Sequence, residues 1–174
     1  MTADNSPPSI LIIGAAQGIG QAIARTFAAD HYHVILADVS ESVYDTVQQI
    51  RVDLPPASLA ATVLDATDLK AVEQLAENIT ELLPDGQQNL QHVVYSAGAG
   101  SGKFGFPFWN MHPADWKRVL DVNLMGAVNV AHAFSKVLRA NLRDNSTKVV
   151  DSTLLFIASI AGQMGSQTDP PYSA

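Results

Sequence analysis

Apolar and polar residues follow one another along this chain in blocks of two kinds. Five short, mainly apolar runs are typical of strands buried on both faces; they cover 10–13, 33–37, 59–64, 92–96 and 154–158. The stretches between them place apolar residues at helical spacing; they cover 41–52, 69–83 and 113–142, after a first one with Ile19, Ala22, Ile23 and Phe27 on one face. Strands that alternate with helices predict an α/β fold, a doubly wound parallel sheet with helices on both faces.

Residues with special roles mark the ends of the predicted helices. We expect Ser40 to cap the helix at 41–52, Asp68 to start the one at 69–83, and Pro113 to occupy a first helical position. The longest helix carries a stripe formed by Trp116, Leu120, Asn123, Ala127, Val130, Phe134 and Leu138. Asn123 is the polar exception. An unpaired amide there would cost about 1–3 kcal/mol, so we expect it to have hydrogen-bond partners.

Composition narrows the class of protein. The 174 residues are 47% hydrophobic, which suits one domain at 9–174 after a flexible polar lead at 1–8. A net charge of −7 argues against nucleic acid as a partner. There is no cysteine, and the five histidines form no close ligand pair, so no metal site is expected. No apolar run reaches the roughly 18 residues of a membrane span. With no signal-peptide pattern, we expect a cytoplasmic protein.

A glycine-rich segment stands at the junction of the first strand and the first helix. Gly14, Gly18 and Gly20 are spaced GxxxGxG. Such a loop brings bare backbone, free N–H groups and the positive end of a helix to a pyrophosphate. The spacing differs from GxGxxG, and the Gly-Lys-Ser/Thr of a P-loop is absent. A tight strand-to-helix turn without a ligand explains the glycines as well, and this alternative stays open for the motif alone.

Asp38 adds weight to dinucleotide binding. It ends the second predicted strand, 18 positions after Gly20, at the edge where open parallel sheets bind ligands. A carboxylate there can accept hydrogen bonds from both ribose hydroxyls of an adenosine and would repel a 2′-phosphate. No basic residue at Gln17 or Val39 offsets that repulsion. NAD(H) is therefore the expected cofactor, although an isolated aspartate can also simply begin a turn.

Six motifs in order resemble the short-chain dehydrogenase/reductase family of classical type. Gly14-x-x-x-Gly18-Ile19-Gly20 resembles its cofactor loop, and Asp65 matches an aspartate near the adenine amine. Tyr95-Ser96-Ala97-Gly98 is similar to its Asn-Asn-Ala-Gly segment. Asn123, Ser159 and Tyr172 match the helix asparagine, the catalytic serine and the tyrosine of Tyr-x-x-x-Lys. The resemblance runs from Ser9 to Ala174 and implies the Rossmann fold.

The resemblance implies a cofactor site and a catalytic site. The expected cofactor-binding residues are Gly14, Gln17, Gly18, Ile19, Gly20, Asp38, Asp65, Ala66, Ser96, Ala97 and Gly98. The expected catalytic residues are Asn123, Ser159 and, 13 positions after the serine, Tyr172. In the family the tyrosine exchanges a proton, and a lysine and the oxidised cofactor lower its pKa from about 10. The serine binds the substrate oxygen and the asparagine holds a water.

Each of these three residues also has a purely structural interpretation. Asn123 could bind a neighbouring backbone, Ser159 could cap the turn after the fifth strand, and Tyr172, beside Pro170-Pro171, could pack a loop. The ordered set of motifs favours the catalytic interpretation. Without that set, the structural one would be preferred for all three.

The sequence departs from the family pattern at three points. Ile13 stands before Gly14, where many members have threonine, and Tyr95 and Ser96 replace two asparagines. The sequence also stops two positions before the expected lysine. We therefore expect the C-terminal third of the fold, about 70–90 residues in this family, to be missing. For the same reason we expect these 174 residues alone to be inactive.

The predicted function is oxidoreduction, with hydride transfer between NAD(H) and an alcohol or ketone. The alternative is a non-catalytic dinucleotide-binding or interaction module of the same fold. A Rossmann-fold methyltransferase fits less well, because it has no use for the Ser159–Tyr172 pair. The resemblance implies a homo-tetramer or dimer built on the long helix, near whose surfaces we expect Trp109, Met111, Val119 and Val137. An aromatic cluster either lines an apolar substrate pocket or belongs to a packed loop or a subunit contact; it contains Phe104, Phe106, Phe108 and Trp109.

Overall fold

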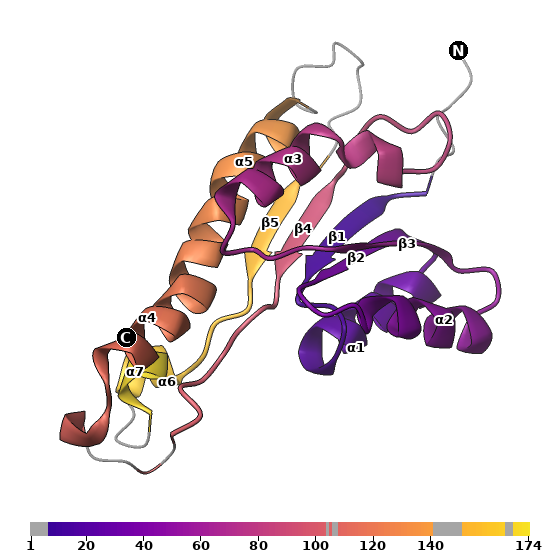
Figure 1. Cartoon of the computed structure of the whole chain (residues 1–174). Coiled ribbons are helices and arrows are strands. Elements are labelled where there is room, and N and C mark those ends of the chain that lie inside the picture. The colour runs from indigo at the N-terminus through magenta and orange to yellow at the C-terminus, as the bar shows by residue number, and fades with distance from the viewer. Residues whose placement is uncertain (1–6, 104, 106–107, 141–150, 166–168) are drawn as a thin grey trace.

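The computed structural model describes residues 7–103, 105, 108–140, 151–165 and 169–174. Its centre is a five-stranded parallel sheet in the order β3-β2-β1-β4-β5 (Figure 1). The strands are β1 (Ser9–Ile13), β2 (His33–Asp38), β3 (Ser58–Val63), β4 (His92–Tyr95) and β5 (Thr153–Phe156). All five lie within a residue or two of the predicted runs, and the doubly wound α/β fold is confirmed.

Helices cover both faces of the sheet (Figure 1). On one face lie α1 (Gly18–Ala29) and α2 (Val43–Asp53); on the other lie α3 (Leu69–Glu77) and α5 (Ala127–Ala140). Shorter elements are the 3₁₀ turns η1 (Ile79–Leu82) and η2 (Phe108–Asn110), and the helices α4 (Pro113–Leu120), α6 (Ala161–Met164) and α7 (Pro170–Ser173). A π-helical segment, η3 (Asp121–Gly126), joins α4 to α5.

The two helical layers explain why the strands are continuously apolar. Successive strand residues point to opposite faces, so a strand covered on both sides needs apolar side chains at every position. Leu11 and Ile13 pack into the layer of α3 and α5, whereas Ile10 and Ile12 pack into the layer of α1 and α2. All four are buried. Because its side chains alternate between the two layers, β1 lies in the middle of the core. It ends at Ile13, at the edge of the sheet where the glycine loop begins.

The buried face of α1 differs from the prediction. Gly20, Ala24 and Ala28 face the sheet, whereas Ile19 and Ala22 are exposed; Ile23 and Phe27 pack at the margin. Close approach explains the difference, because a Cβ atom at Gly20 would lie 2.0 Å from the carbonyl oxygen of Gly14. Small residues therefore form the contact between α1 and the sheet, and a search for large apolar residues at helical spacing could not identify this face.

Other boundaries shift for local reasons. The helix predicted at 69–83 ends at Glu77, and η1 follows it and buries Ile79. Asp68 caps α3 as expected, accepting hydrogen bonds from the backbone N–H groups of Lys70 and Ala71. The N-cap of α2 is Ser42 rather than Ser40. Of the predicted lead at 1–8, residues 1–6 lie outside the described part of the chain.

The long predicted helix is interrupted by the π-helical segment η3. The Tyr95 hydroxyl donates a hydrogen bond to the carbonyl oxygen of Val122, 2.5 Å away, inside this segment. A Cβ atom at Gly126 would lie 2.3 Å from the same hydroxyl oxygen. Position 126 therefore requires glycine, because the Tyr95 hydroxyl occupies the space that a Cβ atom would need. Beyond η3, Val130, Phe134 and Leu138 are buried as predicted, while the predicted end at 141–142 lies outside the described residues.

Two of the four residues expected near an assembly surface are buried in this chain. Met111 and Val119 belong to the core, so they do not offer a contact surface; Trp109 is exposed and Val137 is half-buried. The homo-oligomer stays a prediction. None of the helices that the structure describes is long and apolar enough to cross a membrane.

The fit between Tyr95 and Gly126 predicts a strong steric effect. Gly126→Ala should lower the free energy of unfolding by about 1–3 kcal/mol, because the new methyl group collides with the tyrosine. Combining it with Tyr95→Phe should cost less than the sum of the single changes, because that second change removes the nearest colliding atom. Urea unfolding of the four proteins measures this. Gly162→Ala, where no atom lies within 4 Å of the new Cβ atom, should be nearly neutral. Strict additivity would contradict the steric account.

His33 is a buried histidine with both ring nitrogens engaged. Nε2 lies 2.7 Å from the carbonyl oxygen of Leu82, and Nδ1 lies 2.8 Å from the Ser58 hydroxyl. A carbonyl can only accept, so Nε2 carries the proton and, in the neutral ring, Nδ1 accepts from Ser58. Burial lowers the pKa of His33, although the Leu82 carbonyl acts in the opposite direction.

The lowered pKa of His33 predicts acid sensitivity below neutral pH. The unfolded chain takes up a proton near pH 6.5, whereas the folded protein takes it up only at a lower pH. Stability should therefore fall as pH drops below about 6.5, by at most about 1.4 kcal/mol per pH unit for this group. Urea unfolding at several pH values should show a shallower slope for His33→Gln than for the parent. An NMR titration midpoint for His33 at or above 6.5 would contradict the prediction.

Candidate functional site

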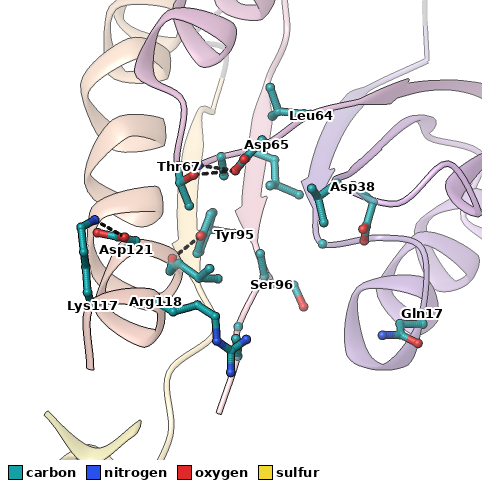
Figure 2. A pocket seen from close by; sticks show the side chains of 18 of the residues that line it. Gln17, Asp38, Leu64, Asp65, Thr67, Tyr95, Ser96, Lys117, Arg118 and Asp121 are labelled. Atoms are coloured by element: carbon teal, nitrogen blue, oxygen red, sulfur yellow. Dashed lines mark hydrogen bonds and ion pairs between the residues drawn. The ribbon is translucent and has the colours of Figure 1, made fainter. Parts of the chain in front are cut away.

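A cavity of about 690 Å³ lies where β1, β2, β3 and β4 end. The strand order changes direction at β1, because β2 lies on one side of it and β4 on the other. Ligands of open parallel sheets bind at such a switch point, outside the carboxyl ends of the strands. The cavity is open between the glycine loop and α4, and Figure 2 shows Gln17 and Asp38 on one side and Lys117, Arg118 and Asp121 on the other.

The glycine loop forms one wall through its backbone. Gly14 has φ +85°, and a Cβ atom there would lie 2.5 Å from the backbone nitrogen of Ala97. Both the left-handed conformation and the close approach require glycine. The N–H groups of Gly14 and Ala15 donate to the carbonyl oxygen of Ala37, so the loop is held against the end of β2.

Asp38 links this loop to the turn after β2. Its Oδ2 accepts a hydrogen bond from the Ala16 N–H at 2.9 Å, and its Oδ1 accepts one from the Ser40 N–H at 3.0 Å. These bonds orient the carboxylate at the cavity. Each carboxylate oxygen can accept more than one hydrogen bond, so capacity for a ligand remains. The turn-starting interpretation and the binding interpretation of Asp38 are thus compatible.

The floor of the cavity follows β3 and β4. Asp65 Oδ1 accepts hydrogen bonds from the N–H and the hydroxyl of Thr67, at 2.9 and 2.8 Å. The Asn129 amide donates to the carbonyl oxygen of Ala66 at 3.0 Å, which anchors this turn to α5. The Ser96 hydroxyl is buried and has no hydrogen-bond partner among the described residues. A buried polar atom of this kind is expected to pair with a ligand or a water.

Charged groups of both signs surround the cavity. Lys117 donates to Asp121 at 2.5 Å, and Arg118 donates to the carbonyl oxygen of Gly100 at 2.6 Å (Figure 2 shows their side chains).

Burial and the nearby charge of Asp65 raise the pKa of Tyr95 to about 12. Tyr95 therefore stays protonated at neutral pH and serves as a hydrogen-bond donor to η3 rather than as a base.

The structure brings together most of the residues predicted to bind a cofactor. Eight line the cavity: Gly14, Gln17, Asp38, Asp65, Ala66, Ser96, Ala97 and Gly98. Gly18, Ile19 and Gly20 form the first turn of α1 and are outside the lining, although Ile19 is exposed.

The three predicted catalytic residues are outside this lining in the described part of the chain. Asn123 lies in η3, and its amide pairs with the backbone of Ala99 through two hydrogen bonds of 2.8 and 3.0 Å. Ser159 is exposed, and its hydroxyl accepts from the Ala161 N–H at 3.2 Å. Tyr172 lies in α7 and is 39% exposed. The structural partners foreseen for Asn123 and Ser159 are therefore present.

Sequence reasoning missed the opposite wall of the cavity. This wall comes from α4 and η3; it consists of Ala114, Lys117, Arg118, Asp121 and Val122. The available signal was topological, because the helix after β4 begins at the ligand-binding edge of the sheet.

In the aromatic cluster, Phe108 and Trp109 are exposed and away from the cavity lining, and Phe104 and Phe106 lie outside the described residues. Within the described ranges, no group of three potential ligands could hold a metal ion.

The donor set fits a dinucleotide. Glycine at positions 14 and 20 lets the loop pack closely on Ala97 and on itself, and the loop backbone leads into the N-terminus of α1. Asp38 supplies a carboxylate suited to ribose hydroxyls. The buried, unpaired Ser96 hydroxyl supplies a further polar contact among the described groups at the β4 end.

The chain matches the model of the short chain dehydrogenase family over residues 8–174. It is 32% identical over 129 residues to sulfoacetaldehyde reductase 2 of Chromohalobacter salexigens, which covers 71% of this chain and 46% of that protein. The chain thus spans about half the length of the curated relatives it matches.

Solved structures of short-chain dehydrogenases have the same fold. A Burkholderia phymatum short chain dehydrogenase/reductase in complex with NAD superposes with a TM-score of 0.81 at 24% identity, over 97% of this chain and 54% of that one. A short chain dehydrogenase of Shigella flexneri 2a str. 301 complexed with NADP gives 0.79 at 23% identity, over 97% and 65%. With its family match over nearly the whole sequence, this chain belongs to the short-chain dehydrogenase family.

Proposed function

We propose that this protein is an oxidoreductase that transfers a hydride between NAD(H) and an alcohol or ketone, with residues 9–174 as its NAD-binding domain. The observation that carries the proposal is the Asp38 carboxylate, held at the cavity by two backbone N–H groups across from the end of β4. It stands at the switch point of a sheet whose adjoining loop is rich in glycine. Together with the family membership, this favours a dinucleotide over other ligands of the same edge.

Different residues of the chain would bind different parts of the cofactor. The loop from Gly14 to Gly20 would bind the pyrophosphate at the N-terminus of α1. Asp38 would accept hydrogen bonds from the adenosine ribose, and Asp65 and Ala66 would face the adenine. Ser96 would donate or accept at the end of β4, where its buried hydroxyl finds no partner among the described residues.

NAD(H) is the proposed form because of local charge. Relatives of this fold have been solved with NAD and with NADP, so the family leaves the choice open. Asp38 would bring a carboxylate to the adenosine ribose, and neither Gln17 nor Val39 would place a positive charge beside it. Among the described residues that line the cavity, the two cations Lys117 and Arg118 are already engaged with Asp121 and with the Gly100 carbonyl.

The proposed chemistry at the substrate uses Asn123, Ser159 and Tyr172. The bound nicotinamide supplies or accepts the hydride. Tyr172 would exchange the proton of the substrate oxygen, Ser159 would donate a hydrogen bond to that oxygen, and Asn123 would hold a water. Because parallel strands end at the same edge, Ser159, three residues beyond β5, stands at the edge that carries the cavity.

A second candidate function is a non-catalytic dinucleotide-binding module. It is favoured by the contacts of Asn123 and Ser159, since the Asn123 amide is paired at both ends with Ala99 and the Ser159 hydroxyl caps a turn. The two candidates agree on the cofactor and differ on turnover. They can therefore be separated by experiments on the same protein.

Cofactor preference tests the role of Asp38. We expect the parent protein to bind NADH more tightly than NADPH, and Asp38→Ala to reduce that ratio by about tenfold, since the loss of hydrogen bonds to the ribose and of charge repulsion act together. Titration of cofactor fluorescence measures both affinities. Asp45→Ala removes an exposed carboxylate on α2, outside the cavity lining, and should leave the ratio unchanged. Equal or tighter NADPH binding by the parent would refute the assignment.

Turnover tests the catalytic assignment. In a screen of alcohols and ketones with NAD(H), run on a protein that also carries the C-terminal third expected of the family, Tyr172→Phe and Ser159→Ala should each lower kcat by about a hundredfold or more, with NADH affinity within about twofold of the parent. Ser173→Ala, next to the tyrosine, is the matched control and should keep turnover. Activity that survives both site changes would exclude this assignment. Tight NADH binding without turnover of any substrate would favour the non-catalytic module.

A further inference from the structure

Three consecutive residues after β4 are each bound by a side chain that is distant in sequence. The Asn123 amide pairs with the backbone of Ala99, and Arg118 donates to the carbonyl oxygen of Gly100. The N–H group of Ser101 donates to Oδ2 of Asp169 at 2.9 Å. The first two contacts come from α4 and η3, in the cavity wall. The third comes from a segment 68 positions later in the chain.

Asp169 is nearly inaccessible to solvent. Asp169 is 2% exposed, and its partner Ser101 is 7% exposed. A carboxylate that leaves water needs hydrogen bonds in exchange, and the backbone N–H group of Ser101 supplies one. Removing the carboxylate would leave this buried N–H group without its partner.

The direction of the Asp169 side chain separates it from an ordinary helix cap. Asp169 is the N-cap residue of α7, a position where an aspartate normally accepts from the N–H groups of its own helix. Within the described helix α7 no such side-chain bond is made. The carboxylate reaches Ser101 instead, while the backbone carbonyl of Asp169 accepts from the Tyr172 N–H at 3.1 Å. One residue thus holds both α7 and the loop after β4.

We propose that Asp169 is a positioning residue that sets the place of Tyr172 relative to the wall of the cofactor cavity. The inference rests on the proposed function for the role of Tyr172, but the link itself stands on the contacts. α7 also packs against α4, whose Arg118 holds the neighbouring carbonyl of Gly100. Both the cavity wall, through Arg118, and the segment that carries Tyr172, through Asp169, are thus hydrogen-bonded to the same loop, residues 99–101. A shift of α7 by a fraction of an ångström would misplace a proton-exchanging hydroxyl.

The test compares Asp169→Ala with Asp169→Asn in the full protein. The alanine variant loses the acceptor, whereas the asparagine variant keeps a carbonyl oxygen of the same length but without charge. Hydrogen exchange followed by mass spectrometry should show faster deuterium uptake in both 98–103 and 169–174 for the alanine variant, by about tenfold. The asparagine variant should stay close to the parent. Asp45→Ala serves as the control for losing one carboxylate.

Turnover and binding then separate positioning from general damage. We expect Asp169→Ala to lower kcat by about tenfold with NADH affinity within about twofold of the parent, and Asp169→Asn to recover most of kcat. Unchanged exchange at 98–103 in the alanine variant overturns the link, and so does equal impairment of both variants. If the alanine variant does not fold, the asparagine variant decides: near-parental kcat and exchange support the proposal, and their loss overturns it. Absence of turnover in a parent that carries the family's C-terminal third defeats the proposed function, while the exchange measurement still decides the link.

Discussion

The close contact between the backbones of Gly14 and Ala97 is the constraint from which the cavity follows. The sheet ladder continues just past β1 and β4, since the Ser96 N–H still donates to the carbonyl oxygen of Ile13. Beyond that bond one segment leads into α1 and the other into the loop after β4. The two backbones are so close at Gly14 and Ala97 that only glycine fits at position 14. A larger residue at position 14 would push the loop away from Ala97 and change the cavity itself.

The loops after β3 and β4 are held in a different way. They have little regular structure of their own, yet their backbone groups are bound by side chains from helices: Asn129 binds the carbonyl of Ala66, and Asn123 and Arg118 bind Ala99 and Gly100. A helix packed in the core moves little, so an amide or guanidinium fixed on it transfers that rigidity to the loop. Asn129, buried and bonded in this way, is as much part of the cavity's construction as the residues that line it.

The sequence was sufficient for features that depend on local pattern. Apolar runs located the strands, and glycine spacing with Asp38 located the cofactor side of the cavity. It was insufficient where tertiary contact decides: the buried face of α1 follows from the approach of Gly20 to Gly14, and the break in the long helix follows from the Tyr95 hydroxyl. The cavity wall at Lys117 and Arg118 escaped prediction for the same reason, because their distance from the strand ends is a property of the packed chain.

The π-helical segment has a consequence for how this region tolerates insertions and deletions. A π turn holds one residue more than the α turn it replaces. If the six residues of η3 wound as a regular α-helix instead, everything after them would be rotated by about 100° relative to α4. Val130 and Phe134 would then turn away from the sheet, and Asn129 from the Ala66 carbonyl. The six residues of η3 thus set the rotational phase between the cavity wall and the core. Deleting one of them leaves a regular helix of the same phase and should be accepted more readily than deleting one residue within α4 or α5.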